Sequence, residues 1–582
     1  MGTKRNYSLL VLCAATLVVA CTPTREHGPG AASVAATPVT VKLIAFNDFH
    51  GQLTPPGGPT RVADPDSAGP GTLDLPTGGV ASLAGLVRQL KAQNPLNAVV
   101  AAGDLIGASP LSSALFHDEP SIEALSALGL EFSSVGNHEF DDGIAELRRM
   151  QNGGCFPGGK DDTCRRGAFA GASFKYLAAN VLDATTGKTI FPAYAVKALP
   201  LAGGRVVKIG FIGAVLKGVP DIVVPSGVRN LTFTDEATAV NAAVPALRAQ
   251  GVSAIVLLIH EGGTISASAF DDTTCADFKG GILPIMDRLD PAVDVVVSAH
   301  THRTYICRRN GRLVTSAGSQ GRFVTDIELS IDPQLRRVIS TSASEIAVVN
   351  DSAPNPAAQR YPTVAKDGQV QAIADFYSAA AAPLTERVVA RIDADISHQA
   401  ATTGESPLGD LIADAQLAAT SAAADGGAQI ALMNLEGIRA NLYARNGRIT
   451  YGEVYAVHPF GNALVTLSLT GAQLHALLEE QWQGGNAVLQ GSAGFTYEWK
   501  AAAPAGSRVD PKSIRLNGVI VDPLARYRVT VNEFLASGGD GFKVLIDGTE
   551  RLRGIPDVDA LEKYLAAHSP VTAPAMGRIR RL

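Results

Sequence analysis

The chain has 582 residues, of which 46% are hydrophobic and 18% are charged, and 55 acidic residues against 49 basic ones give a formal net charge of −6. This composition excludes a collagen-like, coiled-coil or disordered chain. At roughly 100 to 200 residues per domain, the length predicts two to four domains. The weakly acidic balance lacks the basic footprint of a polyanion-binding protein, so any phosphate chemistry has to occur at a local site.

The first segment reads as an export signal. Lys4 and Arg5 precede an apolar run over residues 9–20, which is shorter than the roughly 20 residues needed to span a bilayer, so residues 1–20 are expected to be a secretory signal peptide. Residues 17–21 resemble a bacterial lipobox, which would make Cys21 the lipidated first residue of a tether over residues 21–38. An ordinary signal peptide with an incidental cysteine is the alternative. The expected location is the periplasm or the cell surface.

The cysteines agree with export. Setting aside Cys13 in the leader and Cys21 leaves four, Cys155, Cys164, Cys275 and Cys307. An even number in an oxidising compartment indicates disulfides. Proximity along the chain favours pairing Cys155 with Cys164 and Cys275 with Cys307, and free thiols are the alternative.

Residues 39–350 alternate short apolar runs with segments of helical periodicity. The expected strands are residues 41–46, 97–102, 132–135, 206–215, 254–259 and 293–299, and the expected helices are residues 80–93, 120–130 and 235–250. This alternation predicts an α/β domain in which helices cover a sheet.

A second region follows. Residues 351–391 read as a linker that ends in a helix over 369–391, broken at Pro383. Residues 392–582 mix strand and helix patterns with glycine-rich turns, which predicts a separate α+β domain.

Polar residues stand at the ends of five of the expected strands. They are Asp48 and His50 after the first, Asp104 after the second, Asn137 and His138 after the third, His260 after the fifth, and His300 and His302 after the last. Taken singly, such residues are usually turn or cap residues. Open α/β sheets build their sites at these strand ends, and five coincidences in order are hard to dismiss. The set supplies two carboxylates, one amide oxygen and four imidazoles, enough for two metal ions that share a carboxylate, and leaves His138 for catalysis.

The motifs NDFHG, GD, GNHEFD and AHTH, with His260 between the last two, resemble the calcineurin-like metallophosphoesterases, specifically the bacterial 5′-nucleotidase and UDP-sugar hydrolase family. The resemblance implies a β-sandwich flanked by helices, in an αββα arrangement. It implies that Asp48, His50, Asp104 and His302 hold one metal, and that Asp104, Asn137, His260 and His300 hold the other. It makes His138, oriented by Asp141, the catalytic pair.

The chemistry follows from the expected metals. Two divalent ions about 3.5 to 4 Å apart clamp the attacking and leaving oxygens of an in-line phosphoryl transfer and acidify a bound water. Two such ions, two aspartates and one hydroxide sum to a formal charge of about +1, which attracts a phosphate monoester to an acidic protein. The mixed nitrogen and oxygen ligands suit Zn, Mn, Co or Fe without choosing among them.

The C-terminal region resembles the substrate-binding domain of the same family through four segments, at residues 403–416, 433–439, 458–462 and 532–542. By that resemblance Phe460 and Phe542 would sandwich a nucleobase, Asn434 would hydrogen-bond it, Arg439 would meet ribose or phosphate, and Asp547 would accept from ribose. The alternative is that both phenylalanines are ordinary core residues.

Two departures from the family pattern bear on the substrate. Glu436 places a carboxylate near Arg439, and Thr402 stands where the family often has arginine. Both changes predict a preference for monophosphates over di- and triphosphates.

The expected function is hydrolysis of nucleoside 5′-monophosphates by a hydroxide held between the metals. UDP-sugar hydrolysis, 2′,3′-cyclic phosphodiesterase activity and a non-enzymatic nucleotide-binding lipoprotein are the alternatives. The expected partners are a small nucleotide and a membrane reached through the lipid anchor, with no nucleic-acid polymer.

Overall fold

A computed structural model describes residues 37–64, 72–159, 162–266, 270, 273–483 and 488–582. From Pro38 onward the described residues form one compact unit. The leader and Cys21 lie outside the described residues. Within the described residues, none of the helices combines the length and the hydrophobicity that a membrane-spanning segment requires.

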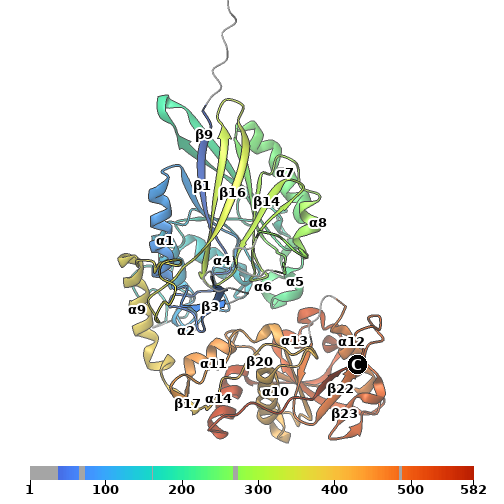
Figure 1. The fold of residues 1–582 in the computed structure, drawn as a ribbon. Coiled ribbons are helices and arrows are strands. Elements are labelled where there is room, and N and C mark those ends of the chain that lie inside the picture. The colour runs from blue at the N-terminus through green and yellow to red at the C-terminus, as the bar shows by residue number, and fades with distance from the viewer. Residues whose placement is uncertain (1–36, 65–71, 160–161, 267–269, 271–272, 484–487) are drawn as a thin grey trace, which may run out of the picture. The chain divides into compact units, whose positions relative to one another are not determined.

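The N-terminal region contains two six-stranded sheets (Figure 1). The first runs in the order β16 (Arg337–Ala347), β15 (Phe323–Asp332), β1 (Val39–Phe46), β4 (Asn97–Ala101), β5 (Phe132–Ser134) and β6 (Lys175–Leu177). The second runs in the order β13 (Thr304–Arg309), β14 (Arg312–Ala317), β12 (Val295–Ser298), β11 (Ala254–His260), β9 (Val206–Val215) and β8 (Tyr194–Pro200). The strands β1, β4, β5 and β6 pair in parallel, as do β9, β11, β12 and β14, so their carboxyl ends share an edge.

Both faces of these sheets are apolar because both are covered. Along β1, Val41, Leu43 and Ala45 belong to a core shared with the second sheet, whereas Ile44 and Phe46 belong to a core shared with helices. This period-2 alternation assigns one face of each sheet to its partner sheet and the other to helices.

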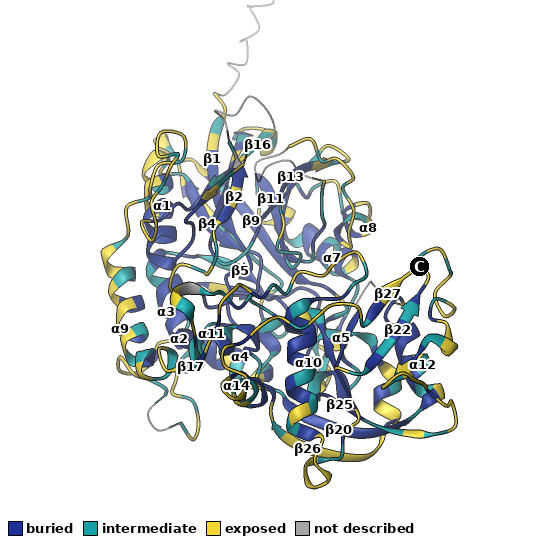
Figure 2. Cartoon of the chain, turned by 60° about the horizontal axis from the view of Figure 1, so that its bottom comes forward, coloured by how far each residue is buried: buried dark blue, intermediate teal, exposed yellow. Residues whose placement is uncertain are grey.

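The covering helices divide between the sheets. The first sheet packs against α1 (Val80–Gln93), α3 (Glu119–Leu128), α4 (Gly143–Asn152) and α9 (Gly368–Thr385). The second packs against α7 (Glu236–Ala249) and α8 (Ile282–Met286). Figure 2 shows buried and exposed residues on opposite sides of α9, as expected for a helix with one face on a core.

The αββα arrangement implied by the family resemblance is therefore confirmed, and the six expected strands form. The alternation of apolar runs and helical segments predicted helices that cover one sheet. The structure corrects this prediction, because the helices cover two packed sheets. Continuous apolar strands need a cover on both faces, and a second sheet supplies it here.

The predicted linker helix is shorter than expected. Helix α9 ends at Thr385, two residues after Pro383, and β17 (Val388–Arg391) then pairs with β19 (Arg448–Thr450). Proline lacks the amide hydrogen that continues a helix, and the following Val388 and Val389 are β-branched and favour a strand.

The C-terminal region is a mixed α+β fold, as predicted. Its main sheet has the order β21 (Leu489–Gly491), β18 (Ile430–Asn434), β25 (Arg526–Asn532), β20 (Ala463–Thr470) and β26 (Thr549–Pro556). A smaller sheet has the order β24 (Val519–Ile520), β23 (Arg515–Leu516), β22 (Phe495–Trp499) and β27 (Ile579–Arg581). The main helices are α10 (Pro407–Thr420), α11 (Tyr451–Val457), α12 (Gly471–Glu480) and α14 (Asp557–Ala567), with the short α13 (Glu533–Ala536) after β25.

Two disulfides join the cysteines that lie near each other in the chain, Cys155 with Cys164 and Cys275 with Cys307. Both pairings match those that proximity favoured. Disulfides form and persist in oxidising compartments, so they indicate a location outside the cytoplasm.

Candidate functional site

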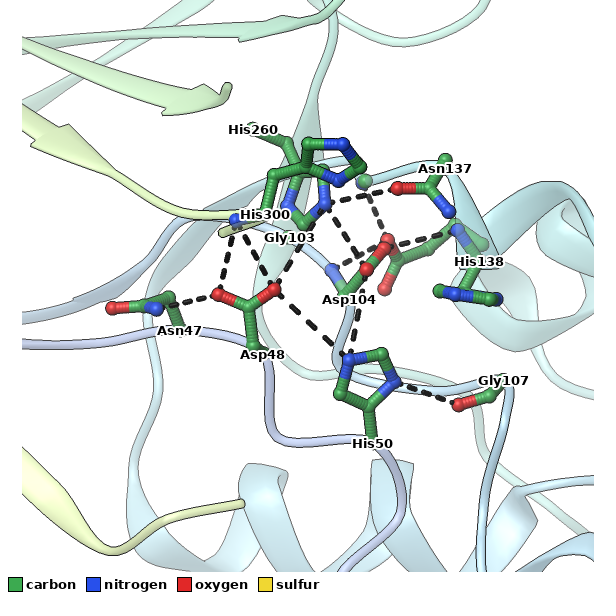
Figure 3. A network of polar contacts seen from close by, with 12 residues as sticks. Asn47, Asp48, His50, Gly103, Asp104, Gly107, Asn137, His138, His260 and His300 are labelled. Carbon is green, nitrogen blue, oxygen red and sulfur yellow. Dashed lines mark hydrogen bonds and ion pairs between the residues drawn. The ribbon is translucent and has the colours of Figure 1, made fainter. Parts of the chain in front are cut away.

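The polar strand ends meet at one place although they come from two sheets. Asp48, His50, Asp104, Asn137 and His138 follow β1, β4 and β5 of the first sheet. The second sheet supplies His260 at the end of β11, and His300 and His302 after β12. Figure 3 shows the Asp48 and Asp104 carboxylates turned toward the imidazoles around them. The sandwich brings the carboxyl ends of its two sheets together at this site.

Asp48, His50 and His302 form the first of three clusters that could hold a metal ion. The Nε2 atoms of His50 and His302 are 3.0 Å apart, and the Oδ1 atom of Asp48 lies 3.4 Å from His302 Nε2 and 4.0 Å from His50 Nε2. Three of the four side chains predicted for this metal thus converge here.

Asp104, His260 and His300 form the second cluster. The Oδ2 atom of Asp104 is 3.0 Å from His260 Nε2 and 3.7 Å from His50 Nε2, so this carboxylate lies between the two clusters. The Oδ1 atom of Asn137 is 3.1 Å from His260 Nε2. The predicted second set is thus brought together, with Asp104 in the position of a shared ligand.

Backbone carbonyls orient two of the imidazoles. His50 Nδ1 is 3.0 Å from the Gly107 oxygen, and His260 Nδ1 is 2.8 Å from the Ala102 oxygen. A carbonyl can only accept, so each Nδ1 carries a hydrogen, and each ring would bind a metal through Nε2 once that atom has lost its proton. This is the usual arrangement around metal-binding histidines.

The electrostatics of the site favour a cation. Asp48 and Asp104 are almost completely buried, and no lysine or arginine within the described residues pairs with either. Burial by itself lowers the pKa of His260, but the Asp104 and Asp48 carboxylates and the Ala102 carbonyl together outweigh burial and raise that pKa to about 10. Burial, assisted by the charge of His260, lowers the pKa of His300 to about 3. Two buried carboxylates therefore demand positive charge here, and a pair of divalent ions on these ligands fits that demand.

The backbone of the ligand loops is unusual. Asp48, His50, Asp104, His300 and His302 all have positive φ, between 48° and 72°. A non-glycine residue in this region costs roughly 1 to 2 kcal/mol, and such residues cluster at functional sites. The fold therefore holds five of the predicted ligands in conformations that their own sequence does not favour.

His138 lies beside both clusters. Its Nδ1 is 2.8 Å from Asp141 Oδ2, which gives the pair the contact that its predicted role requires. The ring also joins His50 and Asp104 in the third metal-competent cluster, a possibility that the sequence interpretation did not include. The ring of Phe460 stacks near it, with the ring centres 5.7 Å apart.

A cavity of 770 Å³ connects these side chains to the C-terminal region. Asp104, Asn137, His138, His300 and His302 line it on the metal side, and Asn434, Arg439 and Phe460 line it from the C-terminal region. Three of the five predicted substrate residues are thus brought to the same cavity as the metal-competent clusters.

The other two predicted substrate residues lie elsewhere. Phe542 is fully buried in the core of the C-terminal region, so it has no ring face to offer a ligand. Asp547 is exposed and does not line the cavity. The structure therefore does not bring either residue to the cavity, and the position of Phe542 matches the alternative of an ordinary core aromatic.

Phe534 and Asp540 are two cavity residues that the sequence interpretation missed. Both line the cavity and lie in the same segment as Phe542. Phe534 is the second residue after β25, in α13, so the strand-end rule that located the metal ligands would also have located it. The ring of Phe534 packs on Gly539, where an added Cβ would lie 2.4 Å from it.

The amide of Asn434 is held on both sides. Its Nδ2 donates to Asp540 Oδ2 at 2.8 Å, and its Oδ1 accepts from Asn532 Nδ2 at 3.0 Å. Burial raises the pKa of Asp540 to about 6, against the hydrogen bond from Asn434. This polar row gives the cavity a fixed set of donors and acceptors.

The two departures from the family pattern have different positions. Glu436 lines the cavity, whereas Thr402 does not and offers its carbonyl to Arg581 at 3.2 Å. Among the described residues, the Arg439 guanidinium hydrogen-bonds only to the backbone oxygen of Glu436, at 3.4 Å.

Arg303 is a further residue that the sequence interpretation missed. It directly follows His302, is exposed and lines the cavity. Across the described part of the chain, no carboxylate forms an ion pair with Arg303 or with Arg439. The cavity thus has two arginines available for an anion.

Comparisons with known proteins agree with this geometry. Residues 41–304 match the calcineurin-like phosphoesterase family, and residues 388–547 match the 5′-nucleotidase C-terminal domain. A solved structure of a 5′-nucleotidase precursor from Thermus thermophilus superposes with a TM-score of 0.72 at 28% identity, covering 94% of this chain and 99% of that one.

Two curated relatives add context. Endonuclease YhcR of Bacillus subtilis is 31% identical over 545 residues, which are 93% of this chain and 41% of YhcR. The cell wall protein Lmo0130 of Listeria monocytogenes is 29% identical over 94% of this chain and 70% of its own length. The chain therefore spans less than half the length of YhcR.

Proposed function

The chain belongs to the 5′-nucleotidase family of calcineurin-like metallophosphoesterases, and we propose that it hydrolyses nucleoside 5′-monophosphates to nucleoside and phosphate. One observation carries the proposal. A single cavity is lined both by members of the His/Asp clusters and by Phe460, Phe534 and Asn434 of the C-terminal region. A nucleotide needs both sides, because its phosphate requires charge neutralisation and its base offers two faces for stacking.

Asp48, His50 and His302 would hold one divalent ion, and Asn137, His260 and His300 would hold the other, with Asp104 between them. When bound, such a pair supplies the Lewis acidity that activates water and neutralises the phosphoryl oxygens. The identity of the metals is part of the proposal, with Zn, Mn, Co and Fe as candidates.

His138 would provide the proton. The Asp141 carboxylate accepts from Nδ1, which leaves Nε2 to donate to the leaving oxygen or to a phosphoryl oxygen. His138 also lines the cavity, so the proton is available where the substrate would lie.

The C-terminal side of the cavity would bind the nucleoside. Stacking on aromatic rings such as Phe460 and Phe534 is worth about 1 to 3 kcal/mol per base. Asn434 and Asp540 would hydrogen-bond base and ribose, and Arg439 and Arg303 would meet the phosphate. The proposed preference for monophosphates now depends on Glu436 alone, because Thr402 is not at the cavity.

UDP-sugar hydrolysis and 2′,3′-cyclic phosphodiesterase activity remain the alternatives among enzymes, since the same clusters would serve them. The name of the relative YhcR adds an endonuclease activity to the activities to be tested. A nucleotide-binding lipoprotein without activity is the alternative of another class.

The test is a substrate panel on purified protein stripped with EDTA and reloaded with Mn, Zn, Co or Mg. We expect phosphate release from AMP to disappear with EDTA and return with metal, and kcat/KM for AMP to exceed that for UDP-glucose, 2′,3′-cyclic AMP and DNA. Activity that EDTA leaves unchanged, or a higher kcat/KM for another substrate, would reject the proposal.

His138→Ala separates an enzyme from a binding protein. General acid–base catalysis contributes about 10² to 10⁴-fold, so kcat should fall by that factor while nucleotide binding remains. An unchanged kcat would remove His138 from the mechanism.

We propose further that the protein is exported and anchored through lipid on Cys21. The disulfides and the cell wall relative Lmo0130 support an extracytoplasmic location, and the lipobox resemblance supports the anchor. Cys21→Ser should release the protein from the membrane fraction and abolish labelling by radioactive palmitate. Membrane association that survives the substitution would contradict the anchor.

A further inference from the structure

Glu139 is a buried carboxylate beside the metal-competent clusters, and it has no role in the proposed mechanism. It follows His138 in the chain and its side chain is 2% exposed, and it does not line the cavity. No lysine or arginine within the described residues forms an ion pair with it. Hydrogen bonds therefore have to stabilise the buried carboxylate, because burying an unpaired carboxylate costs free energy.

Three backbone amides donate to this carboxylate. Oε2 accepts from Asp104 N at 2.9 Å and from Gly136 N at 2.5 Å, and Oε1 accepts from Leu105 N at 2.7 Å. These amides belong to the loops that follow β4 and β5. One side chain therefore joins the loop of the shared ligand Asp104 to the loop that carries Asn137 and His138.

The backbone of the first loop is shaped to receive an anion. Gly103 and Asp104 have consecutive positive φ values of 84° and 49°, and the amides of Asp104 and Leu105 both point at Glu139. Successive amides turned to one side form a concavity that binds anions. In this fold the anion is the Glu139 carboxylate.

The two loops also touch directly. A Cβ added to Gly103 would lie 2.6 Å from the Gly136 nitrogen, and one added to Gly136 would lie 2.1 Å from Asp104 Oδ1. Only glycine at both positions allows this approach, and the approach brings the three amides within reach of one carboxylate.

The bonds between the loops are reciprocal. The His138 amide donates to Asp104 Oδ1 at 2.9 Å, while the Asp104 amide donates to Glu139. This exchange fixes the Asp104 side chain with one oxygen against the β5 loop. The other oxygen, Oδ2, is left facing His260 and His50, where the two clusters meet.

We propose that Glu139 is a positioning residue for the metal centre, which sets the orientation of Asp104 and thereby the affinity of both clusters for divalent ions. This inference rests on the proposed function only in taking Asp104 as a ligand shared between two metals. Losing an interaction of this kind typically costs 10 to 100-fold in metal affinity or activity.

Glu139→Gln is the sharpest variant because it keeps the size of the side chain. The amide has one acceptor oxygen, and its NH₂ group would face the amide hydrogens that Glu139 now accepts. Glu139→Asp keeps the charge but shortens the side chain by one methylene, and it serves if the glutamine variant does not fold.

Glu119 offers a matched control. It is also fully buried, and it accepts from Arg149 Nη1, Thr163 Oγ1 and Cys164 N, each at 2.6 Å. None of its partners belongs to the metal-competent clusters. Glu119→Gln should therefore lower the melting temperature without changing metal affinity.

The experiment is a titration of metal-free protein with Co²⁺, followed by its visible absorption, with Zn²⁺ affinity measured by equilibrium dialysis. We expect Glu139→Gln to weaken Co²⁺ binding by about 10 to 100-fold and to change the shape of the cobalt spectrum. Glu139→Asp should lie between that variant and the wild type, and Glu119→Gln should match the wild type.

Kinetics provide a second readout. With Mn²⁺ at a fixed low concentration, kcat of Glu139→Gln should fall and recover as Mn²⁺ is raised, while KM for AMP stays within about twofold because Glu139 does not reach the cavity. Cobalt affinity and spectrum equal to those of the wild type would overturn the proposal. The cobalt titration needs no substrate, so this failure is distinguishable from a wrong choice of substrate in the proposed function.

Discussion

The N-terminal and C-terminal regions build their sides of the cavity by different means. In the N-terminal region all seven predicted metal ligands lie within the metal-competent clusters or, for Asn137, beside one. In the C-terminal region Phe542 and Asp547 lie outside the cavity, and Phe534 and Asp540 line it instead. A ligand placed directly after a parallel strand inherits its position from the sheet, whereas a residue within a turn-rich segment does not.

The segment from Phe534 to Phe542 shows the reason. Phe534 and Phe542 are the same type of residue and lie near the same glycines, so residue type alone does not show which of them lines the cavity. Phe534 is the second residue after β25, while three glycines and the left-handed Asp540 intervene before Phe542. Each of these residues can reverse the chain, so the direction of the second ring depends on packing that the local sequence does not encode.

The largest expected effect tests the metal side of this comparison. Asp104→Ala removes the carboxylate between the two clusters and should lower kcat by at least about a thousandfold, since metal catalysis contributes several kcal/mol. Metal content by mass spectrometry should fall with it. The control is Asp375→Ala, at an exposed position on α9, which should retain both kcat and metal content. An active Asp104→Ala variant would contradict the role of Asp104 as a shared ligand.

The next prediction tests the C-terminal side directly. Phe534→Ala should raise KM for AMP by about 10 to 100-fold, because stacking is worth about 1 to 3 kcal/mol, and leave the melting temperature nearly unchanged. Phe542→Ala should do the reverse, with unfolding made easier by about 3 to 5 kcal/mol and KM retained in the folded protein.

Steady-state kinetics and thermal denaturation on both variants decide this prediction. If Phe542→Ala raised KM more than Phe534→Ala in folded protein, the original sequence assignment would be restored.

A smaller effect is expected from the arginine that adjoins the metal side. Arg303→Ala should raise KM for AMP by about tenfold, equal to about 1.4 kcal/mol, with kcat little changed, because Arg303 is exposed and its charge is screened. Arg337→Ala, on an exposed part of β16, is the control. Equal KM values for the two variants would show that Arg303 does not contact the phosphate.

The last expected effect concerns the stability of the C-terminal region. His458 is buried, neither ring nitrogen has a hydrogen-bond partner among the described residues, and burial lowers its pKa to about 4. Below pH 6.5 the unfolded chain binds a proton at this residue that the folded protein does not bind until about pH 4, so the contribution of His458 to stability falls as the pH falls through this range. At pH 5 this loss is about 2 kcal/mol.

His458→Leu should therefore lose less melting temperature than the wild type between pH 7 and pH 5, whereas the exposed His568→Leu should follow the wild type. The Asp557 carboxyl, 3.9 Å from His458 Nδ1, has a pKa that burial raises to about 8, so it stays protonated through this window in the folded state. If the melting temperatures of the wild type and His458→Leu fell in parallel with pH, His458 would not be the source of this loss of stability.

Local patterns in the amino-acid sequence predict the strands, the order of the ligands and the favoured cysteine pairs. Apolar periodicity and polar residues after strands are both local signals. Apolar periodicity also predicts a helix over residues 80–93, and α1 has the same bounds in the structure. Pro383 signalled the end of α9, although the helix stops at Thr385 and a strand replaces its expected continuation.

Tertiary packing sets how these local signals combine. It divides the ligands between two sheets, brings Phe534 rather than Phe542 to the cavity, and places Glu139 within hydrogen-bonding distance of the loops of Asp104 and Asn137. Each of these outcomes depends on contacts between segments far apart in the chain. The positive φ values of five ligands show the same dependence, because packing around the site holds a backbone that the residues would not adopt alone.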